Sequence, residues 1–333
     1  MTRLSEDEVI ARFFRPLAGD GAMGLQDDCA LIPRDDAALV VSTDMLVAGV
    51  HFFPDDPADL IARKALRVNL SDLVAKGAMP LSYSLSLALT DDTDAAWLEA
   101  FSDGLAMDQQ AFGLRLSGGD TVRTPGPLSL SITAFGAASA HYPRRGGAKA
   151  GDVIAVTGTI GDAAFGLMLR SAARQGELAS TAAALGLTQA DAKSLIDRYL
   201  VPQPRLAFVA ACGAAIRASM DISDGLVLDL ARMAGAAGLS SILDAASVPL
   251  SVATAKAVQQ APERLTQVLT GGDDYELLLA VAPGAWDAAQ REAKRLQLPL
   301  TRIGAFMEGE GGVTVRDGQG APIPIFNGGH QHF

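Results

Sequence analysis

Hydrophobic positions along the chain change period repeatedly, from the spacing of a helix to the alternation of a strand. Near the N-terminus, Ser5 and Glu8 form a capping-box pair, and apolar residues over 9–17 recur at helical spacing. This pattern predicts a helix. The apolar run "ALVVS" then predicts a buried strand that ends at Ser42.

A longer helix is predicted next, because Asp56 and Pro57 resemble an N-cap and a first-turn proline and the apolar pattern continues to Gly77. Strict alternation in "SYSLSLAL" and "LSLSITAFGA" predicts strands with one apolar face. That sheet lacks enough helix of its own to close both edges, which predicts a symmetric dimer through it. A helix over 94–111 and a strand over 114–120 complete the first half.

A Gly- and Arg-rich segment, 141–152, interrupts the pattern and predicts a boundary between domains 1–140 and 141–333. The second half starts with a strand over 152–158. Helices are predicted over 162–174, 188–199, 205–215, 225–237, 251–260 and 285–297, and strands over 216–221, 240–244, 275–281, 299–305 and 313–316. This mixed order favours two α/β or α+β domains over one doubly wound sheet.

Composition narrows the classes of ligand. The 333 residues are 49% apolar and 20% charged, with a net charge of −11. The densest basic cluster is Arg144, Arg145 and Lys149, too small for a nucleic-acid surface. A phosphate ligand would therefore need metal cations to offset the protein's own charge.

Two cysteines without a metal-binding or disulfide spacing fit the reducing cytoplasm. The acidic residues near the N-terminus do not resemble a signal peptide. The longest apolar run, 206–216, is shorter than the ~20 residues of a membrane span. We therefore expect a cytoplasmic protein with no membrane partner.

Aspartates recur at the ends of apolar elements, beside Gly, Ser or Thr. Any one of them could be a cap or a solvated side chain, and "STD" at 42–44 could be a simple turn. Asn69 and Asp72 share a helix face because they are three residues apart. Mg²⁺ prefers oxygen ligands and bridges carboxylates to substrate phosphates, so the set predicts a cage for a polyphosphate. Its members are Asp27, Asp28, Asp44, Asp72, Asp120, Asp221, Asp224, Asp273 and Asp274.

Common nucleotide and hydrolase signatures are missing from the sequence. It contains neither a P-loop nor the protein-kinase motifs, and G-x-S-x-G does not occur. "VTGTIGDAAFG" lacks the full dinucleotide fingerprint, and close packing of a strand and a helix explains it better. Both halves contain Gly-Gly-Asp, in "SGGDT" and "TGGDDYEL", and each is predicted to be a turn.

Taken together and in order, the motifs resemble those of thiamine-monophosphate kinases. They are "DDCALI", "STDMLVAGVHF", "VNLSDLVAKGAMP", "SGGDT", "RGGAKAGDVIAVTGTIGDAAFGL", "MDISDGLVLDL", "GGDDYEL" and the tail "FNGGHQHF". The resemblance spans nearly the whole chain. It departs at Gln26, where the family usually has glycine.

The resemblance implies ATP-dependent phosphorylation of thiamine monophosphate to thiamine diphosphate with several Mg²⁺ ions. It also implies a PurM-like two-domain fold, α/β followed by α+β, whose N-terminal sheet forms an intersubunit β-barrel in a homodimer. Residues carried over as metal ligands are Asp28, Ser42, Thr43, Asp44, Asp72, Asp120, Asp221 and Asp224. Nucleotide contacts would be Gly119, Asp120, Arg145 and Ser223, and substrate contacts His51, Asp273 and Phe326. The residues expected to carry catalysis are Asp44, Asp72, Asp120 and Arg145.

Two other classes stay open. A relative could use ATP to close a purine ring, as an aminoimidazole ribonucleotide synthetase does, and a nucleotide sensor would need the metal sites without His51 and the aromatic tail. Selenophosphate synthetase and hydrogenase-maturation relatives depend on a cysteine that this sequence does not offer at the expected place. For a kinase, the acceptor phosphate is already ionised, so we expect direct in-line transfer without a phosphoenzyme.

Overall fold

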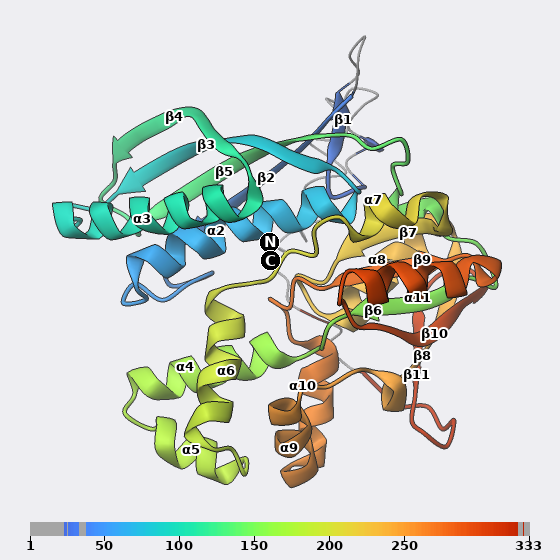
Figure 1. Ribbon diagram of the computed structural model, residues 1–333. Coiled ribbons are helices and arrows are strands. Elements are labelled where there is room, and N and C mark those ends of the chain that lie inside the picture. Colours follow the sequence, from blue (N-terminus) through green and yellow to red (C-terminus); the bar gives the residue numbers. More distant parts are fainter. Residues whose placement is uncertain (1–22, 25, 33–37, 326–328, 330–333) are drawn as a thin grey trace, which may run out of the picture.

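The computed structural model describes residues 23–24, 26–32, 38–325 and 329. The helix expected over 9–17 and the substrate contact expected at Phe326 lie outside these residues. Two β-sheets organise the chain, one built from residues 30–137 and the other from residues 153–316 (Figure 1).

The first sheet has five strands in the order β1-β2-β5-β3-β4. Strands β3 and β4 run parallel, and the other neighbours are antiparallel. Its elements are β1 (Ala30–Ile32), β2 (Leu39–Val47), α2 (Ala58–Ala75), β3 (Met79–Leu89), α3 (Ala95–Phe112), β4 (Arg115–Arg123) and β5 (Ser129–Ala137).

Helices α2 and α3 cover one face of this sheet (Figure 1). Leu130, Ile132 and Ala134 of β5 alternate with less buried neighbours, as the period of two requires. These residues pack on Leu66 and Phe101 of the two helices. The alternation predicted for β3 and β5 is therefore confirmed. On the opposite face, no helix among the described residues covers the sheet.

The second sheet has six strands in the order β11-β8-β10-β6-β9-β7, antiparallel except for β11 and β8. Its strands are β6 (Val153–Thr157), β7 (Ile216–Asp221), β8 (Leu239–Asp244), β9 (Leu277–Val281), β10 (Leu300–Glu308) and β11 (Val313–Arg316). Its helices are α4 (Asp162–Arg174), α5 (Leu178–Ala184), α6 (Gln189–Leu200), α7 (Phe208–Cys212), α8 (Leu226–Ala237), α9 (Val252–Gln260), α10 (Leu265–Thr270) and α11 (Trp286–Arg295).

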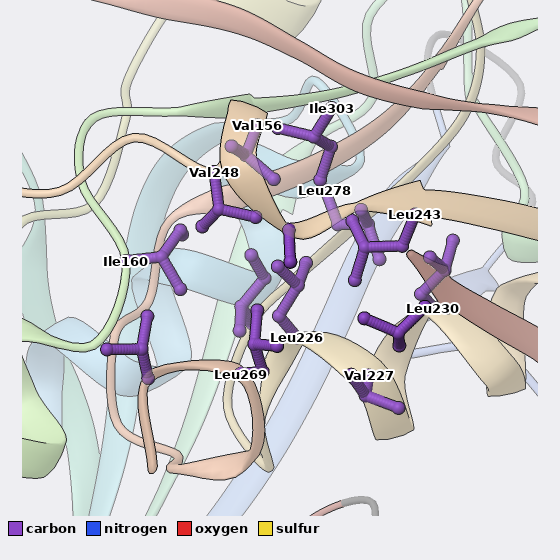
Figure 2. Packing of buried hydrophobic residues seen from close by; sticks show 14 of the residues in the cluster. Val156, Ile160, Leu226, Val227, Leu230, Leu243, Val248, Leu269, Leu278 and Ile303 are labelled. Atoms are coloured by element: carbon purple, nitrogen blue, oxygen red, sulfur yellow. The ribbon is translucent and has the colours of Figure 1, made fainter. Parts of the chain in front are cut away.

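Strand β9 is buried along its whole length because the second sheet is covered on both faces. Leu278 faces a core shared with Val156, Leu226 and Leu230 (Figure 2). Its neighbours in sequence face a separate core formed with α7 and α11. The apolar run of β9 is uninterrupted because alternate side chains pack into two different cores, one on each face of the sheet.

Several sequence predictions need correction. Asp56 is not the N-cap of α2; the cap position is Pro57, and the Asp56 carboxylate instead accepts from Phe53 N and pairs with Arg170. Gly118-Gly119-Asp120 is not a turn but lies inside β4. Helices α5 and α10 were not predicted because each is only one or two turns long. The helix expected over 205–215 is shorter, since α7 ends at Cys212.

Candidate active site

Strand β2 and helix α2 place four polar side chains against each other. Ser42 Oγ donates to Asp72 Oδ2 at 2.5 Å, and the Asp44 backbone N–H donates to Asn69 Oδ1 at 3.0 Å. Asn69 is held in turn by a hydrogen bond from its Nδ2 to Ala65 O. The expectation that Asn69 and Asp72 share one helix face is confirmed. The predicted end of the strand at Ser42 is wrong, because β2 continues to Val47, so this helix face meets Ser42 and Asp44 in the middle of the strand.

Three aspartates from distant segments come together beside this contact. Asp28 precedes β1, Asp72 lies on α2, and Asp221 is the last residue of β7. One carboxylate oxygen from each lies within 4.8 Å of the others. Three such oxygens from rigid segments suit a hard divalent cation.

The three carboxylates differ in their pKa. Burial raises the pKa of Asp72 well above its usual range, and the charges of Asp221 and Asp44 add to the effect. Burial, with the charge of Asp28, raises the pKa of Asp221 to about 8. Burial, followed by the charges of Asp28 and Asp224, raises the pKa of Asp44 to about 6. The basic side chains nearby do not offset the charge of all these carboxylates, so their full ionisation requires added cations.

Asp28 is the exception because a buried lysine and a partly buried arginine face it. Burial alone would raise its pKa, but the charges of Lys76 and Arg145 hold the pKa of Asp28 at about 2. Lys76 Nζ lies 2.6 Å from Asp28 Oδ2 and 2.6 Å from Asp27 Oδ1, and the Arg145 guanidinium pairs with Asp28 as well. Lys76 also donates to Ser219 O at 2.5 Å. Sequence reasoning missed Lys76.

A second acidic group lies at the start of α8. The Asp229 carboxylate accepts from the backbone N–H groups of Ser223 and Asp224 at 3.1 and 3.0 Å. Arg232 pairs with both Asp224 and Asp229. This network fixes the loop that presents Ser223 and Asp224. The Asp224 carboxylate is not part of the group formed by Asp28, Asp72 and Asp221.

A cavity of about 560 Å³ lies beside these groups, between the two sheets. Its volume is in the range of small-molecule sites. His51 lines it, and His51 Nδ1 accepts a hydrogen bond from Val47 N at 3.0 Å, so the ring proton is on Nε2. Other lining residues are Thr43, Asp44, Lys64, Ser223, Asp224, Gly272, Asp273 and Tyr275.

Asp273 and Tyr275 are held in the left-handed region, with φ of 71° and 50°. Hydrogen bonds from Asp273 N to Ser223 O and from Tyr275 N to Ile222 O fix this backbone. Gly272 must be glycine here, because an added Cβ would lie 2.2 Å from Ser223 O. Strained backbone of this kind persists where the surrounding structure imposes it, often at binding sites.

Two predicted site residues lie elsewhere in this chain. Gly119 and Asp120 are in the exposed edge strand β4. The register places Asp120 level with Met45 but three strands away, which is about 14 Å at ordinary strand spacing. Gly119 packs so closely on β3 that an added Cβ would lie 1.7 Å from Leu85 O. Thr43 faces the uncovered side of the sheet, where its hydroxyl donates to Thr133 at 2.9 Å.

The glycine-containing loop before α4 does not offer a phosphate site. Gly161 N and Ala163 N, at the helix N-terminus, donate to the carboxylate of Asp274 at 2.8 and 3.4 Å. A buried side chain of this chain thus fills the position that an anion would take. Close packing is the right explanation of this motif, as the sequence indicated.

Comparisons with known proteins give this geometry its context. The model of the AIR synthase related protein N-terminal domain matches residues 26–138, and that of the C-terminal domain matches residues 149–316. The thiamine-monophosphate kinase of Escherichia coli K12 is 42% identical over 98% of this chain and 98% of its own length. The chain belongs to the thiamine-monophosphate kinase family.

A second member of the thiamine-monophosphate kinase family, from Caulobacter vibrioides, is 40% identical over 92% of this chain and 85% of its own length. The solved structure of AaThiL complexed with AMPPCP and TMP has a TM-score of 0.85 and 28% identity, covering 100% of this chain and 99% of that chain. The two-domain PurM-like fold with mixed sheets is thereby confirmed. Among the described residues, no helix is both long and apolar enough to cross a membrane.

Gln26, the departure from the family's usual glycine, donates its backbone N–H to Met23 O at 3.4 Å. It immediately precedes Asp27 and Asp28, whose carboxylates meet Lys76 and Arg145. The substitution therefore leaves Asp28 within the carboxylate cluster.

Proposed function

We propose that this protein transfers the γ-phosphoryl group of ATP to thiamine monophosphate and so forms thiamine diphosphate. The support from relatives is that close family members carry this kinase name and that a similar structure binds AMPPCP and TMP. The observation that carries the proposal in this chain is the cavity whose wall carries Asp44 and Asp224 together with His51 and Asp273. It offers cation sites and groups for a small organic acceptor within one space.

Magnesium fits the donor set. Carboxylate and hydroxyl oxygens are the ligands Mg²⁺ prefers, and the raised pKa values of Asp44 and Asp221 reflect carboxylates that need counter-charge. We propose that Asp28, Asp72 and Asp221, with Ser42 beside them, hold one such ion. Asp44, Thr43 and Asp224 border the cavity and would serve further ions. Bound ions would neutralise the charge of the two phosphate groups that must approach each other.

The protein's own groups account for positioning. Arg145 supplies a fixed positive charge beside Asp28, and Ser223 lines the cavity wall where the nucleotide would lie. His51 and Asp273 line the same cavity and would contact the thiamine part of the acceptor. The acceptor phosphate is ionised at neutral pH, so alignment and charge neutralisation suffice and no strong base is needed.

Cys29 is not a suitable nucleophile for a covalent intermediate. Burial raises the pKa of the Cys29 thiol well above its usual range, and the charge of Asp72 adds to this. A thiol in that environment is inert, because the thiolate is the reactive form. We therefore propose direct in-line transfer.

We further propose a homodimer in which the two N-terminal sheets close into one β-barrel. Strand β1 pairs with β2 only over Leu39–Val41, so among the described strands the rest of β2 has β5 as its single neighbour. Strand β4 is the other open edge. Closing the edges of two copies against each other would bring Asp120 of the partner subunit next to Asp44. That arrangement would give Gly119 and Asp120 the nucleotide and metal roles expected of them.

On this scheme residues 1–140 form the N-terminal domain and 141–333 the C-terminal domain. The free thiols of Cys29 and Cys212 fit a cytoplasmic location. Phe326 keeps its proposed substrate role.

The test is incubation of the purified protein with ATP, Mg²⁺ and thiamine monophosphate. We expect equal amounts of ADP and thiamine diphosphate. Release of inorganic phosphate with consumption of a formyl-amidine substrate would indicate the ring-closing ligase instead, and nucleotide binding without turnover of either acceptor would indicate a sensor. Thiamine without its phosphate is the matched control acceptor and should give no diphosphate.

A further inference from the structure

Lys64 is a buried lysine that faces the cavity. It lies on α2, two turns before Asp72, and is 2% exposed. Its Nζ lies 2.9 Å from Asp273 Oδ2 and 3.8 Å from the centre of the Tyr199 ring. Burying an ammonium is unfavourable unless it is paired, so its presence here calls for an explanation.

Holding the two domains together is not a sufficient explanation. Other contacts already join them away from the cavity. Arg170 Nε pairs with Asp56 at 2.7 Å, and Arg67 Nη1 donates to Pro202 O at 2.8 Å. The Lys64–Asp273 pair differs from these because both of its residues line the cavity.

The pair keeps hydrogen-bonding capacity for a ligand. An ammonium has three N–H donors, and among the described residues that of Lys64 gives one hydrogen bond, to Asp273. The Asp273 carboxylate accepts that one side-chain hydrogen bond and no other from the described residues, although two oxygens can accept about four. A donor and an acceptor are thus presented side by side within the cavity.

This arrangement matches one part of thiamine. The 4-aminopyrimidine ring carries an amino group, a donor, next to a ring nitrogen, an acceptor. We propose that Lys64 determines specificity for that ring: its ammonium donates to the ring nitrogen while Asp273 accepts from the amino group. The inference rests on the proposed function, since it assumes a thiamine phosphate as acceptor.

Charge and backbone geometry support the assignment. The Lys64–Asp273 pair is neutral as a whole, which suits a neutral heterocycle better than the cationic thiazolium. The left-handed conformation of Asp273 and its hydrogen bond to Ser223 O fix the direction of the carboxylate before any ligand arrives. Because the pair is fixed before the ligand binds, it should discriminate between rings whose donor and acceptor positions differ.

The test compares two acceptors, thiamine monophosphate and oxythiamine monophosphate, in which the 4-amino group is an oxo group and the ring nitrogen carries a proton. The donor and acceptor are then exchanged. We expect the unmodified enzyme to favour thiamine monophosphate by at least about 100-fold in kcat/KM, because a mismatch leaves buried polar groups unpaired.

The variant Lys64→Met keeps the length of the side chain and removes the donor. Its KM for thiamine monophosphate should rise about 100-fold, its KM for ATP should stay within about twofold, and the preference should fall below about tenfold. Arg63→Met is the matched control, because Arg63 is the adjacent residue, pairs with Asp108 at 3.3 Å and does not line the cavity. It should change neither the KM values nor the preference.

The outcomes separate this inference from the proposed function. An enzyme that forms thiamine diphosphate but accepts both acceptors equally overturns the role of Lys64 and leaves the kinase activity intact. A Lys64→Met enzyme that keeps the preference, or loses affinity for ATP to the same extent, also overturns it. Failure of the unmodified enzyme to phosphorylate thiamine monophosphate would reject the proposed function itself. The first measurement needs no variant, so a Lys64→Met protein that does not fold leaves the inference open to refutation.

Discussion

Lys76 Nζ lies 2.6 Å from Asp28 Oδ2, and both side chains are almost completely shielded from solvent, with exposures of 0% and 6%. The same ammonium reaches Ser219 O, two residues before Asp221, and stands one helical turn after Asp72. One side chain therefore joins the three segments that deliver the carboxylates of Asp28, Asp72 and Asp221.

Replacing Lys76 with Met should destabilise the protein, because it leaves the buried carboxylates of Asp27 and Asp28 without this cation. Removing one partner of a buried ion pair costs about 3–5 kcal/mol. The free energy of unfolding in denaturant measures this. Lys193→Met is the control, since Lys193 forms an exposed pair with Asp197 and should change stability by less than about 1 kcal/mol. Equal effects of the two substitutions would show that Lys76 is not a structural cation.

Replacing Asp72 with Asn should separate activity from stability. The substitution keeps the size of the side chain and its neighbour Ser42, but removes a charge that would hold a metal ion. We expect kcat to fall about 1000-fold or more, on the scale of lost electrostatic stabilisation. Without metal, the free energy of unfolding should hold or rise, because repulsion from Asp221 and Asp44 is relieved. Near-normal turnover of Asp72→Asn at low Mg²⁺ would contradict the metal assignment.

The acidic cluster predicts an unusual dependence of stability on pH. Asp44, Asp229 and Asp221 have pKa values raised from 3.8 to about 6, 7 and 8 in the folded protein. A raised carboxyl pKa means that the folded state holds its proton longer than the unfolded state. Stability from these groups is therefore complete below about pH 4 and is lost as the pH rises toward 8. Asp28, with a pKa of about 2, acts in the opposite sense below about pH 4.

Melting temperatures in a chelator should accordingly fall between pH 5 and pH 8, and saturating Mg²⁺ should remove most of that fall. A melting temperature that rises over this range without metal would be inconsistent with the buried carboxylates described above.

In the proposed dimer each active site contains residues of both subunits, and this arrangement can be tested by mixing two variants. Light scattering should give twice the 34.4 kDa of one chain. Asp72→Asn and Asp120→Asn should each be nearly inactive alone. Mixed and allowed to exchange subunits, they should recover up to about a quarter of full activity, because half of the dimers then hold one intact site of two. A mixture that stays inactive, although mixed dimers are present, would place both aspartates in a site of one chain.

Direct transfer predicts inversion at phosphorus. ATP with a stereochemically labelled γ-phosphoryl group should yield thiamine diphosphate of inverted configuration, because a single displacement inverts the centre. Net retention would require two displacements, and a nucleophile other than the inert Cys29 would have to be found.

Local patterns predicted much of the fold. The ends of α4 and β11 match the predicted ranges to the residue, because their apolar periodicity is bounded by Gly and polar residues. The acids of the cluster were also found, because each interrupts or borders an apolar run, although Asp44 and Asp72 lie inside β2 and α2 rather than at their ends. Lys64 and Lys76 were not, because a lysine in a helix gives no local sign of burial. Lys64 meets an aspartate 209 residues away, and only the packing of two domains decides that.

The carboxylate of Asp274 occupies the N-terminus of α4, and this affects how the enzyme can bind ATP. The N-terminus of α4 is closed to anions, and the chain carries a net charge of −11. Binding of the negatively charged nucleotide would therefore depend on bound divalent ions. The affinity for ATP should then rise with the concentration of free divalent ions, because ATP and the ions must bind together. Magnesium supply, rather than ATP supply, would set the fraction of enzyme ready to act whenever nucleotide is plentiful.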